Sequence, residues 1–121
     1  MPELIECLKD KRIIKITSYG EITEIDLQKS REQVINICSE HGYTKILVDA
    51  TNLSAKLPII PAFNHGLFIA KNFTLRKARH AIVVNKENSQ LIDFIVTVAI
   101  NRGANLKSFY SIDEAERWLF E

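Results

Sequence analysis

Two short groups of polar residues in this sequence could form a binding site at one edge of a β-sheet. Each group follows a short apolar run of the kind that forms a buried strand. In an open α/β sheet, ligands gather beyond the carboxyl ends of such strands. We therefore predict a pocket for a ligand or partner formed by Asp49, Thr51, Asn52, Asn85, Lys86, Asn88 and Ser89.

The chemistry of this predicted pocket would favour an anion. A helix is expected to begin directly after the second polar group, and the free N–H groups of its first turn attract negative charge, which Lys86 would reinforce. The alternative interpretation is purely local. In that case Asp49 accepts hydrogen bonds in an Asx-turn with Thr51, and Ser89 caps its helix.

A cluster of basic residues forms a second candidate site. Between Ala50 and Lys86 the chain has six Lys or Arg residues and no Asp or Glu, whereas the segments on both sides are net acidic. We interpret the densest part either as a solvated surface around a helix end or as a patch that binds an anion or an acidic partner. The residues of this predicted patch are Lys71, Arg76, Lys77 and Arg79.

The sequence contains no recognisable catalytic or metal-binding motif. It lacks the Gly-rich phosphate-binding loops and the Gly-x-Ser-x-Gly turn, and it has four glycines in all. His41, His65 and His80 have no partners at metal-ligand spacing. Cys7 and Cys38 have neither Cys-x-x-Cys spacing nor a histidine beside them in the sequence. We predict no enzyme activity, no metal and no cofactor.

Length and composition predict a single domain over residues 1–121. Of the 121 residues 46% are hydrophobic, which is enough for one core without disulfides. The net charge of +1 argues against nucleic acid as the main partner. The first residues do not resemble a signal peptide, and no apolar run approaches the roughly 18 residues of a membrane span. A cytoplasmic protein is therefore expected.

Periodicity and helix-end signals predict the elements that position these groups. Two β-prone stretches around a polar turn predict an antiparallel hairpin, and Thr23 with Asp26 resembles a capping box for a helix that ends at Gly42. The strands are expected at 4–8, 12–17, 45–49, 78–84 and 106–109. Further helices are expected at 60–75 and at 89–102 with Asn88 or Ser89 as cap. The capping-box spacing of Ser111 and Glu114 predicts a last helix, whose buried face includes Trp118 and Leu119. The order β-β-α-β-α-β-α-β-α predicts an α/β fold with one mixed sheet.

The helix expected at 89–102 is apolar on more than one face. Its hydrophobic residues spread well beyond the stripe of about 100° that a surface helix buries against its own sheet. A large apolar face that is left uncovered marks an interaction site. The sequence therefore predicts a homodimer in which this helix contacts a second copy.

The order of the elements and three stretches, 46–49, 102–109 and 113–119, resemble the STAS-like group of small bacterial proteins. That group is related to anti-sigma-factor antagonists, and its fold is distantly comparable to the CRAL-TRIO lipid-binding domain. The resemblance covers nearly the whole chain. It implies a non-enzymatic binding or regulatory module that acts through protein contacts. The alternative is a small-molecule binder for an acidic or lipid-like ligand.

One departure from the STAS-like pattern bears on regulation. STAS-domain antagonists carry a phosphorylated serine in an Asp-Ser-Ser-Gly type motif at the start of the helix after the central strand. Here that region reads Leu57-Pro58-Ile59-Ile60-Pro61 and has no hydroxyl group. The resemblance therefore implies the fold without the serine switch. The apolar replacement suits a protein contact, a lipid-like ligand or ordinary core packing.

Overall fold

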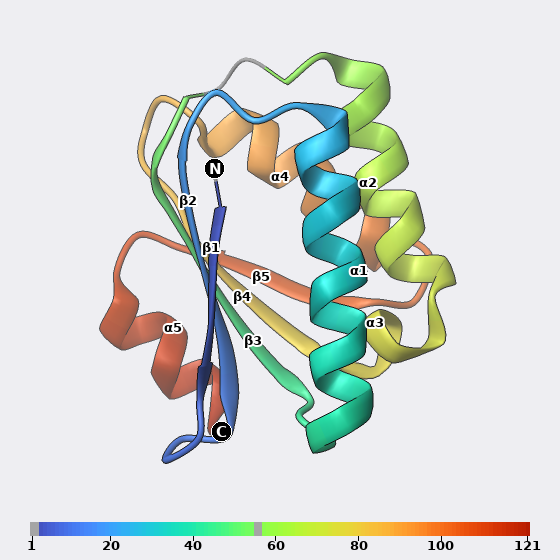
Figure 1. The fold of residues 1–121 in the computed structure, drawn as a ribbon. Helices are drawn as coiled ribbons and strands as arrows, with labels where there is room; N and C mark the ends of the chain where they lie inside the picture. The colour runs from blue at the N-terminus through green and yellow to red at the C-terminus, as the bar shows by residue number, and fades with distance from the viewer. Residues whose placement is uncertain (1–2, 55–56) are drawn as a thin grey trace.

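A computed structural model describes residues 3–54 and 57–121, and it contains a single five-stranded sheet (Figure 1). The strands lie side by side in their order along the chain. β1 pairs with β2 in antiparallel fashion, and all later neighbours are parallel. This arrangement confirms the predicted mixed sheet that begins with a β-hairpin. The strands are β1 (Glu3–Leu8), β2 (Ile13–Gly20), β3 (Lys45–Leu53), β4 (Arg79–Val83) and β5 (Asn105–Phe109).

The helices cover the two faces of the sheet unequally. Four of them lie on one face, and a single helix lies on the other face beside the C-terminus (Figure 1). The four are α1 (Glu24–His41), α2 (Ile59–Lys71), α3 (Phe73–Lys77) and α4 (Ser89–Ile100). The single helix on the opposite face is α5 (Ile112–Leu119). Among the helices described, none is long and apolar enough to cross a membrane.

Local signals explain where α1 begins and ends. The Thr23 side chain accepts a hydrogen bond from the N–H of Asp26, and the Asp26 carboxylate accepts one from the N–H of Thr23. At the other end, Gly42 adopts a φ of 69° and donates its N–H to the carbonyl of Cys38 over 2.8 Å. The left-handed conformation at this position favours glycine. The predicted capping box and the predicted helix end are both confirmed.

The prediction of one helix over 60–75 is wrong, because this segment forms two helices. Asn72 leaves the helical region with φ −80° and ψ 122° and separates α2 from α3. Its side-chain oxygen accepts a hydrogen bond from the N–H of Leu75 over 3.1 Å, so it caps the second helix. An asparagine side chain that bonds to nearby backbone competes with the helix, which explains the break.

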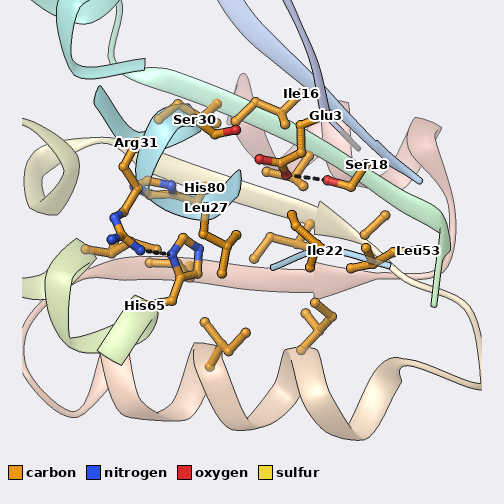
Figure 2. Close-up of a pocket in the computed structure, with 18 of the residues that line it drawn as sticks. Glu3, Ile16, Ser18, Ile22, Leu27, Ser30, Arg31, Leu53, His65 and His80 are labelled. Atoms are coloured by element: carbon orange, nitrogen blue, oxygen red, sulfur yellow. Dashed lines mark hydrogen bonds between the residues drawn. The ribbon is translucent and has the colours of Figure 1, made fainter. Parts of the chain in front are cut away.

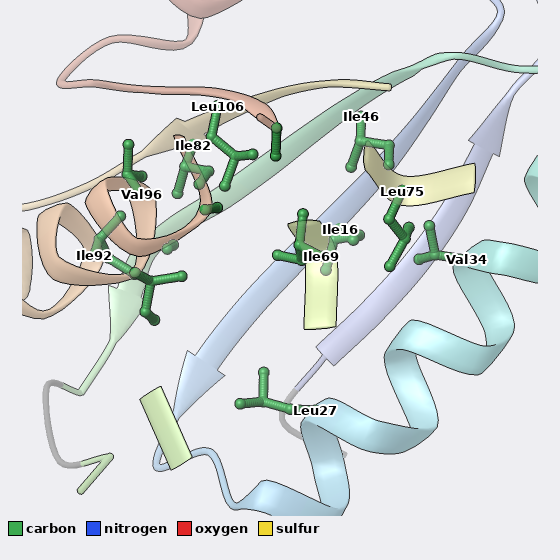
Figure 3. Close-up of a cluster of buried hydrophobic side chains, with 14 of the residues drawn as sticks. Ile16, Leu27, Val34, Ile46, Ile69, Leu75, Ile82, Ile92, Val96 and Leu106 are labelled. Carbon is green, nitrogen blue, oxygen red and sulfur yellow. The ribbon is translucent and has the colours of Figure 1, made fainter. Parts of the chain in front are cut away.

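Alternate residues of the strands supply two hydrophobic clusters. The larger cluster lies between the sheet and α1 to α4; Figure 3 shows Ile16 and Ile46 of the strands near Leu27 and Val34 of α1 and Ile69 of α2. The smaller cluster lies under α5. It comprises Ile13, Leu47, Ala81, Val83, Ala115 and Leu119. Neighbouring residues of one strand thus serve opposite faces, as the two-residue period of a strand requires.

The apolar surface of α4 is used largely inside the chain. Besides its sheet face, α4 packs against α2, where Gly66 lets the two helices approach closely. A Cβ atom at position 66 would lie 2.8 Å from the carbonyl oxygen of Ile95 and 3.1 Å from the Cβ of Val98. The excess of hydrophobic residues that suggested a homodimer therefore has an intramolecular explanation.

Candidate functional site

The ends of β3 and β4 bring part of the predicted polar pocket together. Four of its residues line an open hollow at this edge of the sheet: Thr51, Asn52, Asn85 and Lys86. Asp49 and Ser89 do not line this hollow. The parallel pairing of β3 with β4 explains the proximity, because the carboxyl ends of parallel neighbours meet at one edge.

The Asn88 side chain is fully buried beneath this edge and links the loop after β4 to the end of β3 by hydrogen bonds. Its side-chain amide donates to the carbonyls of Ala50 and Leu53 over 2.7 and 3.1 Å, and its side-chain oxygen accepts from the N–H of Asn85 over 3.1 Å. Asn85 in turn donates its side-chain amide to the carbonyl of Thr51 over 2.6 Å. The two amides therefore tie the loop after β4 to the end of β3, and Asn88 makes no side-chain cap for α4.

Asp49 and Ser89 make local hydrogen bonds. The Asp49 carboxylate accepts from the N–H and from the hydroxyl of Thr51, over 3.1 and 2.7 Å. This is the Asx-type arrangement considered above as the alternative to a pocket. The hydroxyl of Ser89, the first residue of α4, donates to the carbonyl of Lys86 over 3.3 Å. Both side chains therefore have structural roles in the loops that follow the strands.

The predicted basic patch divides between the two faces of the sheet. Lys71, Arg76 and Lys77 are exposed at the end of α2 and along α3. Arg79 instead donates to the carbonyl of Trp118 over 2.6 Å, and its guanidinium carbon lies 4.6 Å from the centre of the Trp118 ring. Trp118 belongs to α5, so Arg79 lies on the opposite face. Lys56, another basic residue of this segment, lies outside the described residues.

A partly open cavity of about 100 Å³ lies between the sheet and helices α1 to α4 (Figure 2). Its wall consists mostly of Ile, Leu, Val and Ala side chains from the larger hydrophobic cluster. Polar side chains from the sheet and from two helices interrupt this apolar wall. They are Glu3, Ser18, Ser30, Arg31, His65 and His80, and none of them belongs to the sites predicted from the sequence.

Arg31 and His65 form one polar pair of the cavity wall. The Nη1 of Arg31 donates to the Nδ1 of His65 over 3.0 Å, and the guanidinium carbon lies 4.5 Å from the centre of the Phe68 ring. Burial and the nearby charge of Arg31 lower the pKa of His65 to about 3. His65 is therefore neutral at pH 7 and accepts the hydrogen bond from the charged guanidinium.

Glu3 and Ser18 form a second polar pair, which comes from β1 and β2. The Ser18 hydroxyl donates to the Glu3 carboxylate over 2.6 Å. Burial raises the pKa of Glu3, and hydrogen bonds from Ser18 and Ser30 partly oppose this shift. Figure 2 shows this pair on the sheet side of the cavity, away from Arg31 and His65.

A signal for these cavity residues is present in the sequence. Arg31 stands four residues after Leu27 and three before Val34, so it lies on the apolar stripe of α1. Glu3 precedes Ile5 and Cys7 at two-residue intervals and therefore shares their face of β1. The sequence-based prediction missed Arg31 and Glu3 because it used only the apolar residues of each periodic pattern. A charged residue on an otherwise buried face was the informative exception.

Because of the buried side chain of His80, we expect the folded protein to lose stability in mild acid. Its Nε2 donates to the carbonyl of Leu75 over 2.7 Å, and burial lowers its pKa from 6.5 to about 4. Between these two values the unfolded chain binds a proton that the folded chain excludes. The free energy of unfolding should therefore fall as the pH drops through this window, by about 1.4 kcal/mol per pH unit for this group, and it should not depend on this group at higher pH.

Urea unfolding at pH 7, 6 and 5 measures this effect. His80→Gln keeps an amide donor for the Leu75 carbonyl and does not titrate, so the pH slope should decrease by the contribution of one proton. His65 contributes to the pH slope of the unfolding free energy in the wild type and in the variant alike. An unchanged slope in the variant would show that His80 is not responsible.

The arrangement of strands and helices matches several solved structures. An uncharacterized protein of the DUF3478 family from Shewanella loihica is 22% identical over 97% of this chain and 91% of that chain, with a TM-score of 0.62. It is described as having a SpoIIAA-like fold. This chain has the SpoIIAA-like fold. The predicted STAS-like architecture is thereby confirmed.

Two anti-sigma factor antagonists share the SpoIIAA-like fold at lower identity. The antagonist from Mycobacterium paratuberculosis is 12% identical over 98% of this chain and 93% of that chain, with a TM-score of 0.65. SpoIIAA in its unphosphorylated form is 11% identical over 98% of this chain and 97% of that chain, with a TM-score of 0.62. No family model and no curated protein matches the chain.

Proposed function

We propose that this chain is a non-enzymatic binding module that acts through contact with a protein partner. Two of its neighbours in the SpoIIAA-like fold are anti-sigma factor antagonists. Among the described residues, no group of three or more His, Cys, Asp or Glu side chains is placed to hold a metal ion. The polar residues at the sheet edge bond mainly to one another and to nearby backbone, which suits a structural role better than catalysis.

One exposed apolar and basic surface carries this proposal. We define the α2–α3 surface as Phe68, Lys71, Phe73, Arg76 and Lys77, at the junction of the two helices. The Phe73 side chain is 75% exposed, and the Nζ of Lys77 lies 4.9 Å from the centre of its ring. Exposed aromatic side chains next to cations are typical of binding surfaces. The complementary partner is a protein with an apolar patch bordered by Asp and Glu side chains.

Photo-crosslinking in cells that naturally express the protein tests this proposal. A photoreactive phenylalanine at position 73 should form a covalent adduct with one discrete partner protein, and Lys71→Glu with Lys77→Glu should abolish this adduct. Position 120 is a matched control, because Phe120 is 46% exposed and the Nζ of Lys45 lies 5.1 Å from its ring centre. That position should give no such adduct.

Binding of the purified partner completes the test. Phe73→Ser should raise the dissociation constant of the complex at least tenfold, and Phe120→Ser should leave it unchanged. Equal adducts at both positions, or none at position 73, would contradict the α2–α3 surface as the binding site.

The second candidate function is small-molecule binding. The cavity between the sheet and the helices, with charged and polar groups in an apolar wall, supports this candidate. Most of the apolar residues of α4 pack within the chain. The homodimer expected from the sequence stays a prediction. The cytoplasmic location also stays a prediction.

A further inference from the structure

Two uncharged histidine rings in the cavity wall each have one ring nitrogen without a hydrogen-bond partner among residues 3–54 and 57–121. The Nδ1 of His65 accepts from Arg31, so the ring proton is on Nε2, and no described residue accepts it. The Nε2 of His80 donates to the Leu75 carbonyl, so its Nδ1 has a lone pair that receives no described donor. The wall therefore offers one hydrogen-bond donor and one acceptor.

A molecule in the cavity can reach these two nitrogen atoms. In the part of the chain that the structure describes, the buried side-chain nitrogen or oxygen atom without a partner is the Nε of Arg31. The unpaired nitrogens of His65 and His80 are not among such buried atoms, so each keeps accessible surface. His80 is only 5% exposed and lies within the core, so this surface faces the cavity. In Figure 2 the His65 ring bonds to Arg31 through one nitrogen and turns the other away from it.

The rest of the wall favours an uncharged molecule. Its two charged side chains have opposite signs and have partners within the protein. The Glu3 carboxylate accepts from Ser18, and the Arg31 guanidinium donates to His65. Neither group therefore requires a charge on the ligand, and a charged ligand would lose its hydration without a matching counter-charge. The aliphatic side chains around them, Leu27, Ile69, Ile82 and Ile92 among them, offer contacts with hydrocarbon.

The size of the cavity restricts the ligand further. A volume of about 100 Å³ is too small for a drug-sized molecule. An apolar protein cavity of roughly 150 Å³ can bind benzene. Because the present cavity is partly open, a single ring or a short hydrocarbon chain is the appropriate scale.

We propose that the cavity binds a small uncharged alcohol or phenol whose hydroxyl oxygen accepts a hydrogen bond from the Nε2–H of His65. A hydroxyl group both accepts and donates, so its proton is available to the Nδ1 of His80. The hydrocarbon part lies among the aliphatic side chains. The proposal rests on the small-molecule candidate above and not on the α2–α3 surface, so the two can fail separately.

Titration with phenol, toluene and sodium benzoate, observed by NMR, tests this ligand class. Toluene has a methyl group in place of the hydroxyl, and benzoate adds a negative charge. Phenol should shift the methyl resonances of Leu27, Ile69 and Ile92. It should bind about tenfold more tightly than either of the other two compounds, because each of them leaves the His65 donor or its own charge without a partner. Equal binding of phenol and toluene would overturn the hydroxyl contact, and no binding of either would overturn the small-molecule candidate as well.

His65→Asn separates the hydrogen bond from the shape of the cavity. The asparagine side-chain oxygen takes the place of Nδ1 and keeps an acceptor for Arg31, whereas the Nε2–H is lost. Phenol binding should weaken about tenfold in this variant, and toluene binding should not weaken. Equal losses for phenol and toluene would contradict the hydrogen bond to His65.

His41→Asn is the matched control variant. His41 is exposed, stacks on Tyr43 and does not line the cavity. This variant should bind phenol as the wild type does. If His65→Asn fails to fold, the comparison of phenol with toluene in the wild-type protein still decides.

Discussion

Asn88→Ala is expected to lower the free energy of unfolding by about 3 kcal/mol, because it removes three hydrogen bonds at a buried position that are worth about 1 kcal/mol each. The Asn88 side chain has no solvent exposure and connects the Ala50 and Leu53 carbonyls with the N–H of Asn85. Alanine leaves these three backbone groups without that partner. Urea unfolding followed by circular dichroism measures the loss.

Two further variants make this experiment specific. Asn88→Asp keeps the shape and the acceptor but removes both donated hydrogen bonds, so it should also destabilise the protein. Asn52→Ala changes an exposed asparagine at the same edge of the sheet and should alter the unfolding free energy by less than about 0.5 kcal/mol. A loss below about 1 kcal/mol for Asn88→Ala would show that these carbonyls find other partners.

Gly66→Val is expected to destabilise the protein by about 3 kcal/mol through overpacking between α2 and α4. Even a Cβ atom at this position would approach the Ile95 carbonyl oxygen to 2.8 Å. That oxygen belongs to the backbone of α4, so the contact is relieved only by moving one helix away from the other. Thermal unfolding monitored by circular dichroism should show a markedly lower midpoint.

Asn64→Val is the matched control, because position 64 is exposed on the same helix. Asn64→Val introduces the same β-branched side chain at a position that does not face the backbone of α4. The change in the free energy of unfolding then reflects helix propensity alone and should stay below about 1 kcal/mol. Equal midpoints for the two variants would contradict a tight crossing of α2 and α4.

Sequence reasoning succeeded where structure depends on near neighbours. The boundaries of α1 follow from Thr23 and Gly42, whose hydrogen bonds involve residues three or four positions away. The parallel strands are evident from apolar runs such as 46–48. The break at Asn72 was missed because an asparagine within an apolar helical pattern is compatible with two outcomes, a solvated side chain or a cap for a new helix.

The candidate sites were less accessible to sequence reasoning. Thr51 and Asn85 do meet at the edge of the sheet, since parallel pairing of their strands follows from the order of the elements. The sequence predicts Asn88 in a binding pocket and Arg79 in a basic patch, yet Asn88 is fully buried and Arg79 bonds to Trp118 of α5. The side-chain direction at these positions depends on packing and not on the local pattern.

Strand and helix periods, end caps and residue types are local properties, so the amino-acid sequence was enough to predict the class of fold, the mixed sheet and the lack of a serine where α2 begins. Folding brings Arg31 next to His65, 34 residues away, and places both in the wall of a cavity. The structure also shows that α4 packs part of its apolar surface against α2. Contacts between distant segments depend on how helices pack over the sheet, and no periodic pattern in the chain encodes that packing.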